Sequence, residues 1–97
     1  MATTVMLEVR AKAGTGSDVN RAFQEILPDT RAYDGCHGVD VYRNDDDADV
    51  IVLVEQWESR AHYERYLAWR METGLLAKLA EALDGDPSIR YFSKTDA

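Results

Sequence analysis

The chain has 97 residues, of which 45% are hydrophobic. This length predicts one domain, residues 1–97, that buries a core without the help of disulfides or metal ions. Its formal net charge of −7 argues against nucleic acid, because phosphate backbones are bound by clustered Lys and Arg. The single cysteine excludes an internal disulfide, and no apolar run approaches the roughly 20 residues of a membrane span.

The chain begins MATTVMLEVR, without the basic start and long apolar stretch of a secretory signal, so we expect a cytoplasmic protein. Residues 4–11 alternate between apolar and polar side chains, which predicts a first strand. Ser17 is a favourable N-cap for a first helix, whose apolar residues recur at helical spacing to about Tyr33. Pro28 inside this helix predicts a kink or a restart.

Residues 38–43 alternate again and predict a second strand, which the acidic residues 44–49 join to a third strand at residues 50–57. The acidic stretch lacks the spacing and the central Gly of a calcium-binding loop, which favours a solvated hairpin turn. The third strand is apolar on both faces, so both faces need a cover. One cover is a helix layer, and a second copy of the chain can supply the other, which predicts a homodimer with sheets packed face to face.

Ser59 caps a second helix that continues to about Thr73, and after a bend at Gly74 an apolar stripe predicts a further helical segment. Residues 84–87 end this segment, and residues 88–93 form the last strand. The order is therefore βαββαβ. It fits a ferredoxin-like α+β sandwich, an antiparallel sheet with the helices on one face.

Two segments, TRAYDGCHGVDVYR at residues 30–43 and VLVEQWESRAHYERYL at residues 52–67, resemble the antibiotic biosynthesis monooxygenase domain family. The resemblance spans nearly the whole chain and implies small proteins that pair into dimeric α+β barrels. The family includes cofactor-free oxygenases of aromatic polyketides, quinol-oxidising members and haem-degrading members. It therefore implies oxygen chemistry on an aromatic substrate.

The resemblance extends to pocket residues of the cofactor-free oxygenases. Trp57 and Tyr63 fall on the family's Trp and Tyr positions, and Arg70 approximates its Arg position. Leu53 stands where those oxygenases have an Asn, and Tyr66 stands where many relatives carry a His. These two departures imply a different substrate or a lost activity.

A helical wheel places Arg70 among the apolar residues of the second helix that should face the sheet. A buried guanidinium needs a partner, because an isolated charge out of water costs several kcal/mol. A structural ion pair with Glu55 or Glu58 is one interpretation. A phenolate or carboxylate on a bound ligand is the other.

The candidate site therefore consists of catalytic and substrate-binding residues, and several of them also have a purely structural interpretation. Trp57 is either core or pocket wall, and His62 is either a helix-surface residue or a general base. We expect the catalytic residues to be Trp57, Tyr63, Arg70 and His62. We expect the substrate-binding residues to be Leu53, Glu55, Tyr66, Trp69 and Phe23.

No metal-ligand spacing, phosphate-binding loop or nucleophile–base pair occurs in the sequence. We therefore expect no metal and no cofactor, and chemistry that an electron-rich substrate performs itself with dioxygen. The leading hypothesis is a cofactor-independent monooxygenase acting on a small aromatic phenol, quinol or polyketide-like substrate in a pocket between sheet and helices. The alternative is a non-catalytic homodimeric small-molecule-binding protein. A third reading, isomerisation or ring closure, needs the same base without oxygen.

Overall fold

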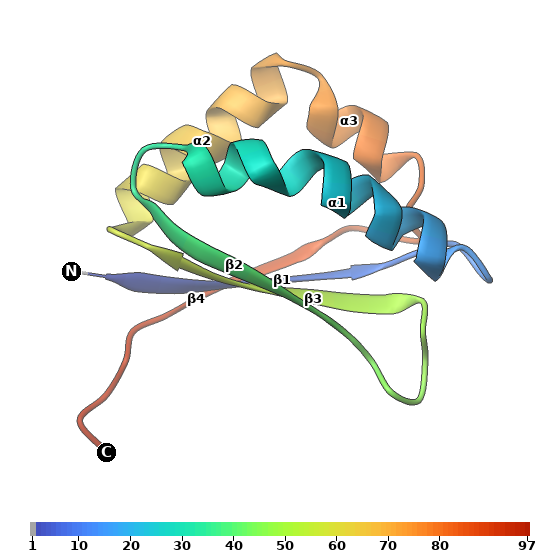
Figure 1. Ribbon diagram of the computed structural model, residues 1–97, viewed down its shortest axis with the longest axis horizontal. Helices are drawn as coiled ribbons and strands as arrows, with labels where there is room; N and C mark the ends of the chain where they lie inside the picture. The colour runs from blue at the N-terminus through green and yellow to red at the C-terminus, as the bar shows by residue number, and fades with distance from the viewer. Residues whose placement is uncertain (1) are drawn as a thin grey trace.

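The computed structural model describes residues 2–97 and confirms the predicted order of strands and helices. The elements are β1 (Thr3–Arg10), α1 (Gly16–Ala32), β2 (Cys36–Arg43), β3 (Val50–Trp57), α2 (Arg60–Glu72), α3 (Leu75–Ala80) and β4 (Ser88–Phe92). The strands form one antiparallel sheet in the order β2-β3-β1-β4, and the helices lie together on one face of it (Figure 1). This is the ferredoxin-like α+β arrangement that the sequence predicts.

The alternation of the central strands supplies the core. In β1 and β3 every second side chain points under the helices, and the register pairs Leu7 with Leu53 and Val9 with Ile51. Phe23 of α1 packs onto this layer. Burial of a side chain of this size stabilises the fold by about 1.5–3 kcal/mol. The fully or nearly buried members of this aliphatic core are Val9, Ala11, Val19, Phe23, Leu27, Val39, Ile51, Leu53 and Leu83.

The opposite face of the sheet carries no helix of residues 2–97 (Figure 1), and Met6, Val52 and Val54 lie at its centre. Val52 and Val54 of β3 are half-buried there, because neighbouring strands shield them only from the sides. Tyr42 of β2 and Phe92 of β4 are exposed, at 57% and 43%. We call this surface the open face. It is the face for which the sequence predicts a second copy of the chain.

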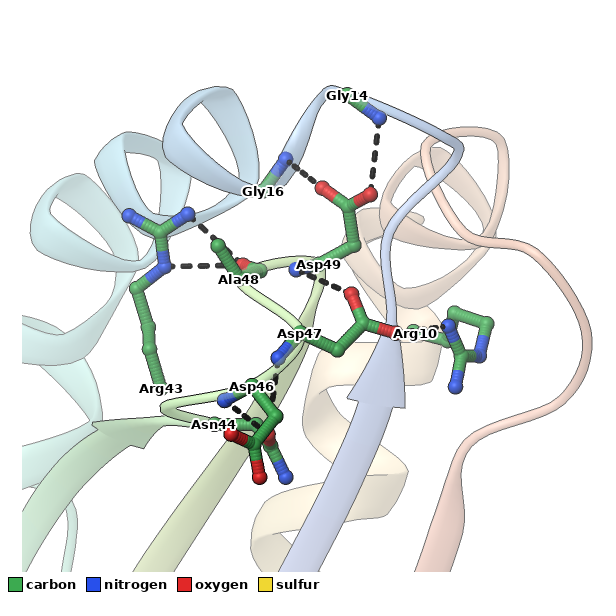
Figure 2. A network of polar contacts seen from close by, with 9 residues as sticks. All are labelled: Arg10, Gly14, Gly16, Arg43, Asn44, Asp46, Asp47, Ala48 and Asp49. Atoms are coloured by element: carbon green, nitrogen blue, oxygen red, sulfur yellow. Dashed lines mark hydrogen bonds and ion pairs between the residues drawn. The ribbon is translucent and has the colours of Figure 1, made fainter.

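The first helix begins two residues earlier than predicted, so Ser17 is not its N-cap. Thr15 occupies the cap position without a side-chain cap hydrogen bond. Instead, the carboxylate of Asp49, just before β3, accepts hydrogen bonds from Gly14 N and Gly16 N, both at 2.9 Å (Figure 2). A carboxylate at this helix end satisfies free N–H groups and complements the helix dipole.

The acidic turn between β2 and β3 is therefore docked against α1 as well as solvated. Asp47 binds Arg10 at 2.8 Å, and the Arg43 guanidinium donates two hydrogen bonds to Ala48 O at 3.0 and 2.8 Å (Figure 2). Gly16 lies so close to Ala48 O that a Cβ there would collide with this backbone oxygen. Hydrogen bonds and close backbone packing thus hold the turn against the start of α1.

Pro28 does not restart α1, which is continuous from Gly16 to Ala32. The proline ring removes one N–H donor, which leaves the carbonyl one turn earlier without its helical partner. Because Pro28 is exposed, water can hydrogen-bond to that carbonyl. Tyr33 lies just beyond the helix in extended conformation. This exit directs its ring toward α2, where it joins the site described below.

The start of α2 is as predicted, because Ser59 Oγ accepts a hydrogen bond from His62 N at 3.2 Å. Gly74 separates α2 from α3 in a left-handed conformation, φ 79°, which glycine adopts without strain. The short α3 has no buried residue. None of the helices between residues 2 and 97 is long and apolar enough to cross a membrane.

Candidate functional site

Aromatic rings gather where the end of β3 meets α2. The Trp57 ring lies at the centre, with its centroid 5.4 Å from that of Tyr63 in a T-shaped pair and 5.1 Å from that of Tyr66. Trp57 is 0% exposed and Tyr63 is 1% exposed. We call these residues the ring cluster: Tyr33, Trp57, Tyr63, Tyr66, Trp69 and Tyr91. Packed pairs of this kind add about 0.5–1.5 kcal/mol each beyond burial.

A buried carboxyl group lies against the centre of the ring cluster. Glu55 is two residues before Trp57 on the same face of β3, and its Oε1 accepts a hydrogen bond from Trp57 Nε1 at 3.1 Å. Glu55 is only 2% exposed. Burial raises the pKa of Glu55 to about 7, although the hydrogen bond from Trp57 acts in the opposite direction. A carboxyl with this pKa can take up and release a proton near neutral pH.

The guanidinium of Arg70 joins α2 to α1. Its Nη2 donates to Ile26 O and to Thr30 Oγ1, both at 3.0 Å, and its Nε donates to Tyr66 Oη at 3.0 Å. The hydroxyls of Thr30 and Tyr66 are themselves 2.6 Å apart. Arg70 is only 6% exposed, so these neutral acceptors replace much of its lost hydration. This network fixes the Tyr66 ring from its hydroxyl end.

The predicted ion pair of Arg70 with Glu55 or Glu58 is wrong. Glu55 accepts a hydrogen bond from Trp57, Glu58 Oε2 accepts one from His37 Nε2 at 2.7 Å, and no carboxylate within residues 2–97 pairs with Arg70. The reason is direction: Arg70 points from α2 toward α1, away from β3. Its Cζ also lies 4.5 Å from the centroid of the Trp69 ring, a cation–π contact that further supports the buried charge.

An apolar cavity of about 250 Å³ lies beside the ring cluster, between α3 and the sheet. Tyr63 forms its boundary with the ring cluster and supplies the only hydroxyl among the lining side chains, since the others are aliphatic. We call this space the inner cavity. Its lining consists of Leu7, Val9, Tyr63, Leu67, Leu76, Leu79, Ala80, Leu83, Pro87 and Ile89.

The structure thus separates the predicted wall residues into two groups. Tyr63 lines the inner cavity, whereas Trp57 and Tyr66 are packed behind it as buried core. Burial raises the pKa of Tyr63 far above its usual range, and the nearby Glu55 charge adds to this effect. Burial also raises the pKa of Tyr66. Both phenols are therefore neutral hydrogen-bond donors at physiological pH.

Four other predicted residues lie around or outside this arrangement. Trp69 stacks on Tyr33 at a centroid distance of 5.3 Å, on the side of the ring cluster facing α1. Leu53 belongs to the aliphatic core. Phe23 lines a separate groove of about 330 Å³ between α1 and β2, and Tyr63 is not among the residues of that groove. His62 is held at the start of α2, with Nδ1 2.7 Å from Ser59 Oγ, and does not line the inner cavity.

Sequence reasoning missed the contribution of α3 to the site. Leu76, Leu79 and Leu83 line the inner cavity, and their helical spacing was visible as an apolar stripe. The stripe alone does not distinguish a helix that fills a core from one that roofs a cavity. Met71, an apolar residue next to Arg70 on α2, is 65% exposed and takes no part in the site.

Comparison with known proteins identifies the group to which this architecture belongs. The family model described as antibiotic biosynthesis monooxygenase matches residues 2–70, which is most of the chain. The chain belongs to the antibiotic biosynthesis monooxygenase family. The resemblance seen in the sequence is thereby confirmed.

Among curated members of this family, the chain is similar to an Escherichia coli K12 protein named "Probable quinol monooxygenase YgiN". The two are 36% identical over 93 residues, covering 86% of each chain. The same level of identity holds for the protein of that name from Shigella flexneri.

Solved structures share the fold of this antibiotic biosynthesis monooxygenase family member. Rv0793 from Mycobacterium tuberculosis superposes with a TM-score of 0.84 at 21% identity, over 100% of this chain and 98% of that one. A conserved protein from Methanosarcina mazei Go1 gives 0.85 at 17% identity, over 98% and 94%. At these identities the likeness shows a common fold.

Proposed function

We propose that this protein is a cofactor-independent monooxygenase that oxidises a small aromatic quinol or phenol in the inner cavity. The observation that carries the proposal is the position of Tyr63. Its ring lines the apolar cavity on one side and packs on Trp57 on the other, next to the carboxyl of Glu55. Membership of the family and the similarity to a protein named as a quinol monooxygenase support the reaction class.

The roles of the residues follow from their surroundings. Tyr63, as a neutral phenol, donates a hydrogen bond to the substrate oxygen and so stabilises negative charge on it. Glu55 lies behind Tyr63 and does not line the inner cavity, so the substrate proton would pass to it through the Tyr63 hydroxyl, and its pKa of about 7 suits a base near neutral pH. Trp57 holds the Glu55 carboxyl in place. Arg70 acts at a distance from the cavity, by fixing Tyr66 and the packing of α2 on α1.

The chemistry requires no group beyond substrate, dioxygen and a base. Loss of one proton converts the quinol to its anion, which transfers one electron to dioxygen and gives a semiquinone and superoxide. Their recombination forms a C–O bond, and protonation gives a ring hydroperoxide. Loss of water then leaves a hydroxylated quinone, with one oxygen atom in the product and one in water. The aliphatic lining keeps bulk water away from these intermediates.

We further propose that the protein acts as a homodimer joined through the open face. Half-buried valines at the centre of that face, with exposed Tyr42 and Phe92 at its edges, form an apolar surface without a cover among residues 2–97. A second copy would cover it in a face-to-face packing of two sheets. Tyr63 and the inner cavity lie on the other side of the sheet, so each subunit would hold its own site.

The test is oxygen uptake by the purified, metal-chelated protein with menadiol and with anthrone, corrected for autoxidation. We expect Tyr63→Phe and Glu55→Gln each to reduce uptake by about 100-fold, the effect typical of losing a positioned donor or base. Tyr91→Phe is the matched control. The centroid of the Tyr91 ring lies 5.9 Å from that of Tyr63, but Tyr91 does not line the inner cavity. Uptake that Tyr63→Phe leaves unchanged would overturn the assignment.

The alternative, a non-catalytic binding protein of the same fold, is favoured by Leu53, which stands where the cofactor-free oxygenases carry an Asn. Leu53 is buried in the aliphatic core and supplies no polar group. Menadione binding without oxygen uptake from menadiol or anthrone would support this alternative.

A further inference from the structure

A second cavity, again of about 250 Å³, lies on the outer side of α3, between α3 and α1. Its apolar floor includes Ile26 and Leu75, and its rim carries the charged side chains of Glu25 and Lys78. We call this space the outer groove. The inner cavity and the outer groove therefore flank the same short helix.

One side chain of α3 lines both spaces. Leu79 borders the inner cavity and the outer groove, whereas Leu76 borders only the inner cavity and Leu75 only the outer groove. The Leu79 side chain is thus the partition between them. It is half-buried and packs against the edge of the aliphatic core.

We propose that Leu79 is a specificity-determining gate that limits the length of the ring substituent on the substrate. The inference rests on the proposed function, which places the aromatic ring in the inner cavity. With Leu79 in position, a substituent longer than a methyl group has to displace this side chain to reach the outer groove. The substrate class is therefore a quinol with one or two rings and a short apolar substituent.

The size of the inner cavity supports this limit. Its volume of about 250 Å³ lies just below the range of roughly 300–1,000 Å³ that is usual for drug-sized ligands. It suits a small ring system and leaves no room for a long chain. The inner cavity and the outer groove together reach that range, so removing the partition should admit a long apolar chain.

The surroundings of Leu79 allow the gate to be altered without loss of the fold. No residue of α3 is buried, and the helix follows Gly74, whose left-handed conformation makes a bend without strain. The far end is held separately, by hydrogen bonds from Lys12 N to Ala82 O at 3.3 Å and from Asp84 N to Arg10 O at 2.8 Å. Truncation at position 79 should therefore change the partition and leave both ends of the segment attached.

The experiment measures binding of menadione and of its 3-butyl, 3-octyl and 3-dodecyl homologues by quenching of tryptophan fluorescence, without turnover. We expect the native protein to bind menadione best. In Leu79→Ala, affinity for the octyl and dodecyl homologues relative to menadione should rise by about ten-fold or more, as burial of roughly two further methylene groups predicts. Leu79→Val should shift the preference in the same direction by less, and serves if the alanine variant does not fold.

The neighbouring leucines are the controls. Leu75→Ala enlarges only the outer groove and Leu76→Ala only the inner cavity, and neither removes the partition, so neither should raise the relative affinity for the octyl and dodecyl homologues as Leu79→Ala does. An equal shift in Leu75→Ala, or an unchanged preference in both Leu79 variants, would overturn the gate. Chain-length selection by Leu79 without oxygen uptake would keep the gate and reject the oxygenase. Uptake that depends on Tyr63, together with an unchanged chain-length preference in both Leu79 variants, would keep the oxygenase and reject the gate. Absence of quinone binding in all variants would reject both.

Discussion

The indole N–H of Trp57 and the buried carboxyl of Glu55 are joined by a 3.1 Å hydrogen bond along one face of β3. The bond couples the protonation of Glu55 to the position of the ring on which Tyr63 packs. It satisfies a carboxyl that is only 2% exposed and stands among apolar and aromatic side chains. A buried acid of this kind decreases the stability of the fold whenever it is ionised.

The first prediction concerns pH. The pKa of Glu55 is raised from an ordinary 4.5 to about 7, so between these values the folded protein holds a proton that the unfolded chain has released. The free energy of unfolding should therefore fall as pH rises through this window, by about 3 kcal/mol, and level off above it. Urea unfolding at several pH values measures the fall. Glu55→Gln should abolish it, whereas Glu58→Gln, which changes an exposed carboxyl, should retain it.

The second prediction isolates the Trp57 hydrogen bond. Trp57→Phe removes the donor that favours the ionised carboxylate, so the pKa of Glu55 should rise above about 7. The pH at which stability levels off should move upward by the same amount. Trp69→Phe keeps the bond and should leave that pH unchanged. A downward shift in Trp57→Phe would contradict the coupling.

The third prediction concerns Arg70. Arg70→Met removes three hydrogen bonds, two of which tie α2 to α1, and leaves Thr30 and Tyr66 with fewer partners. We expect the free energy of unfolding to decrease by about 2–4 kcal/mol, as for other buried charged donors. Arg65→Met, an exposed arginine on the same helix, should change it by less than about 0.5 kcal/mol. Denaturant unfolding compares the two.

Much of the fold follows from periodicity in the sequence. The alternation at residues 4–11 predicts β1 to within one residue, the apolar run at residues 50–57 predicts β3 with the bounds that the structure shows, and Ser59 predicts the start of α2. These features are local, because strand alternation and an N-cap depend on residues a few positions apart. The N-terminus of α1 was misjudged for the opposite reason. Its capping group, Asp49, lies 33 residues away in the sequence.

The site was only partly predictable, for a geometric reason. The sequence identifies Trp57, Tyr63 and Tyr66 as members of one aromatic group, and the structure brings them together. Whether a ring is wall or core depends on what lies behind it, and for Tyr63 that is decided by α3. The partner of Arg70 depends likewise on the rotation of α2 against α1, which a helical wheel does not give.

The fourth prediction tests the remote cap of α1. Asp49→Ala removes the acceptor of the Gly14 and Gly16 N–H groups and should lower the free energy of unfolding by about 1–2 kcal/mol. Asp46→Ala is the matched control. Its carboxylate is exposed, and only its backbone N–H contributes to the turn. Thermal unfolding should separate the two variants, and equal melting temperatures would show that the hairpin does not cap α1.

The last prediction concerns the open face. Val54 lies at its centre, opposite Met6 on β1 and Asp40 on β2. Val54→Arg would place a charge inside the proposed interface, where it loses hydration without a partner from the second copy. Asp40 can pair with the new guanidinium on the surface of a single subunit, so the monomer should stay folded. Sedimentation velocity should show a dimer for the native protein and a monomer for this variant.

The control adds the same charge to the helix layer. Ala68 is exposed on α2, on the opposite side of the molecule from the open face, and Ala68→Arg should remain dimeric. Dissociation of Ala68→Arg together with persistence of the Val54→Arg dimer would move the interface to the helices. In that arrangement the valines of β3 would face water in the native protein, and their half-buried state would come from the neighbouring strands alone.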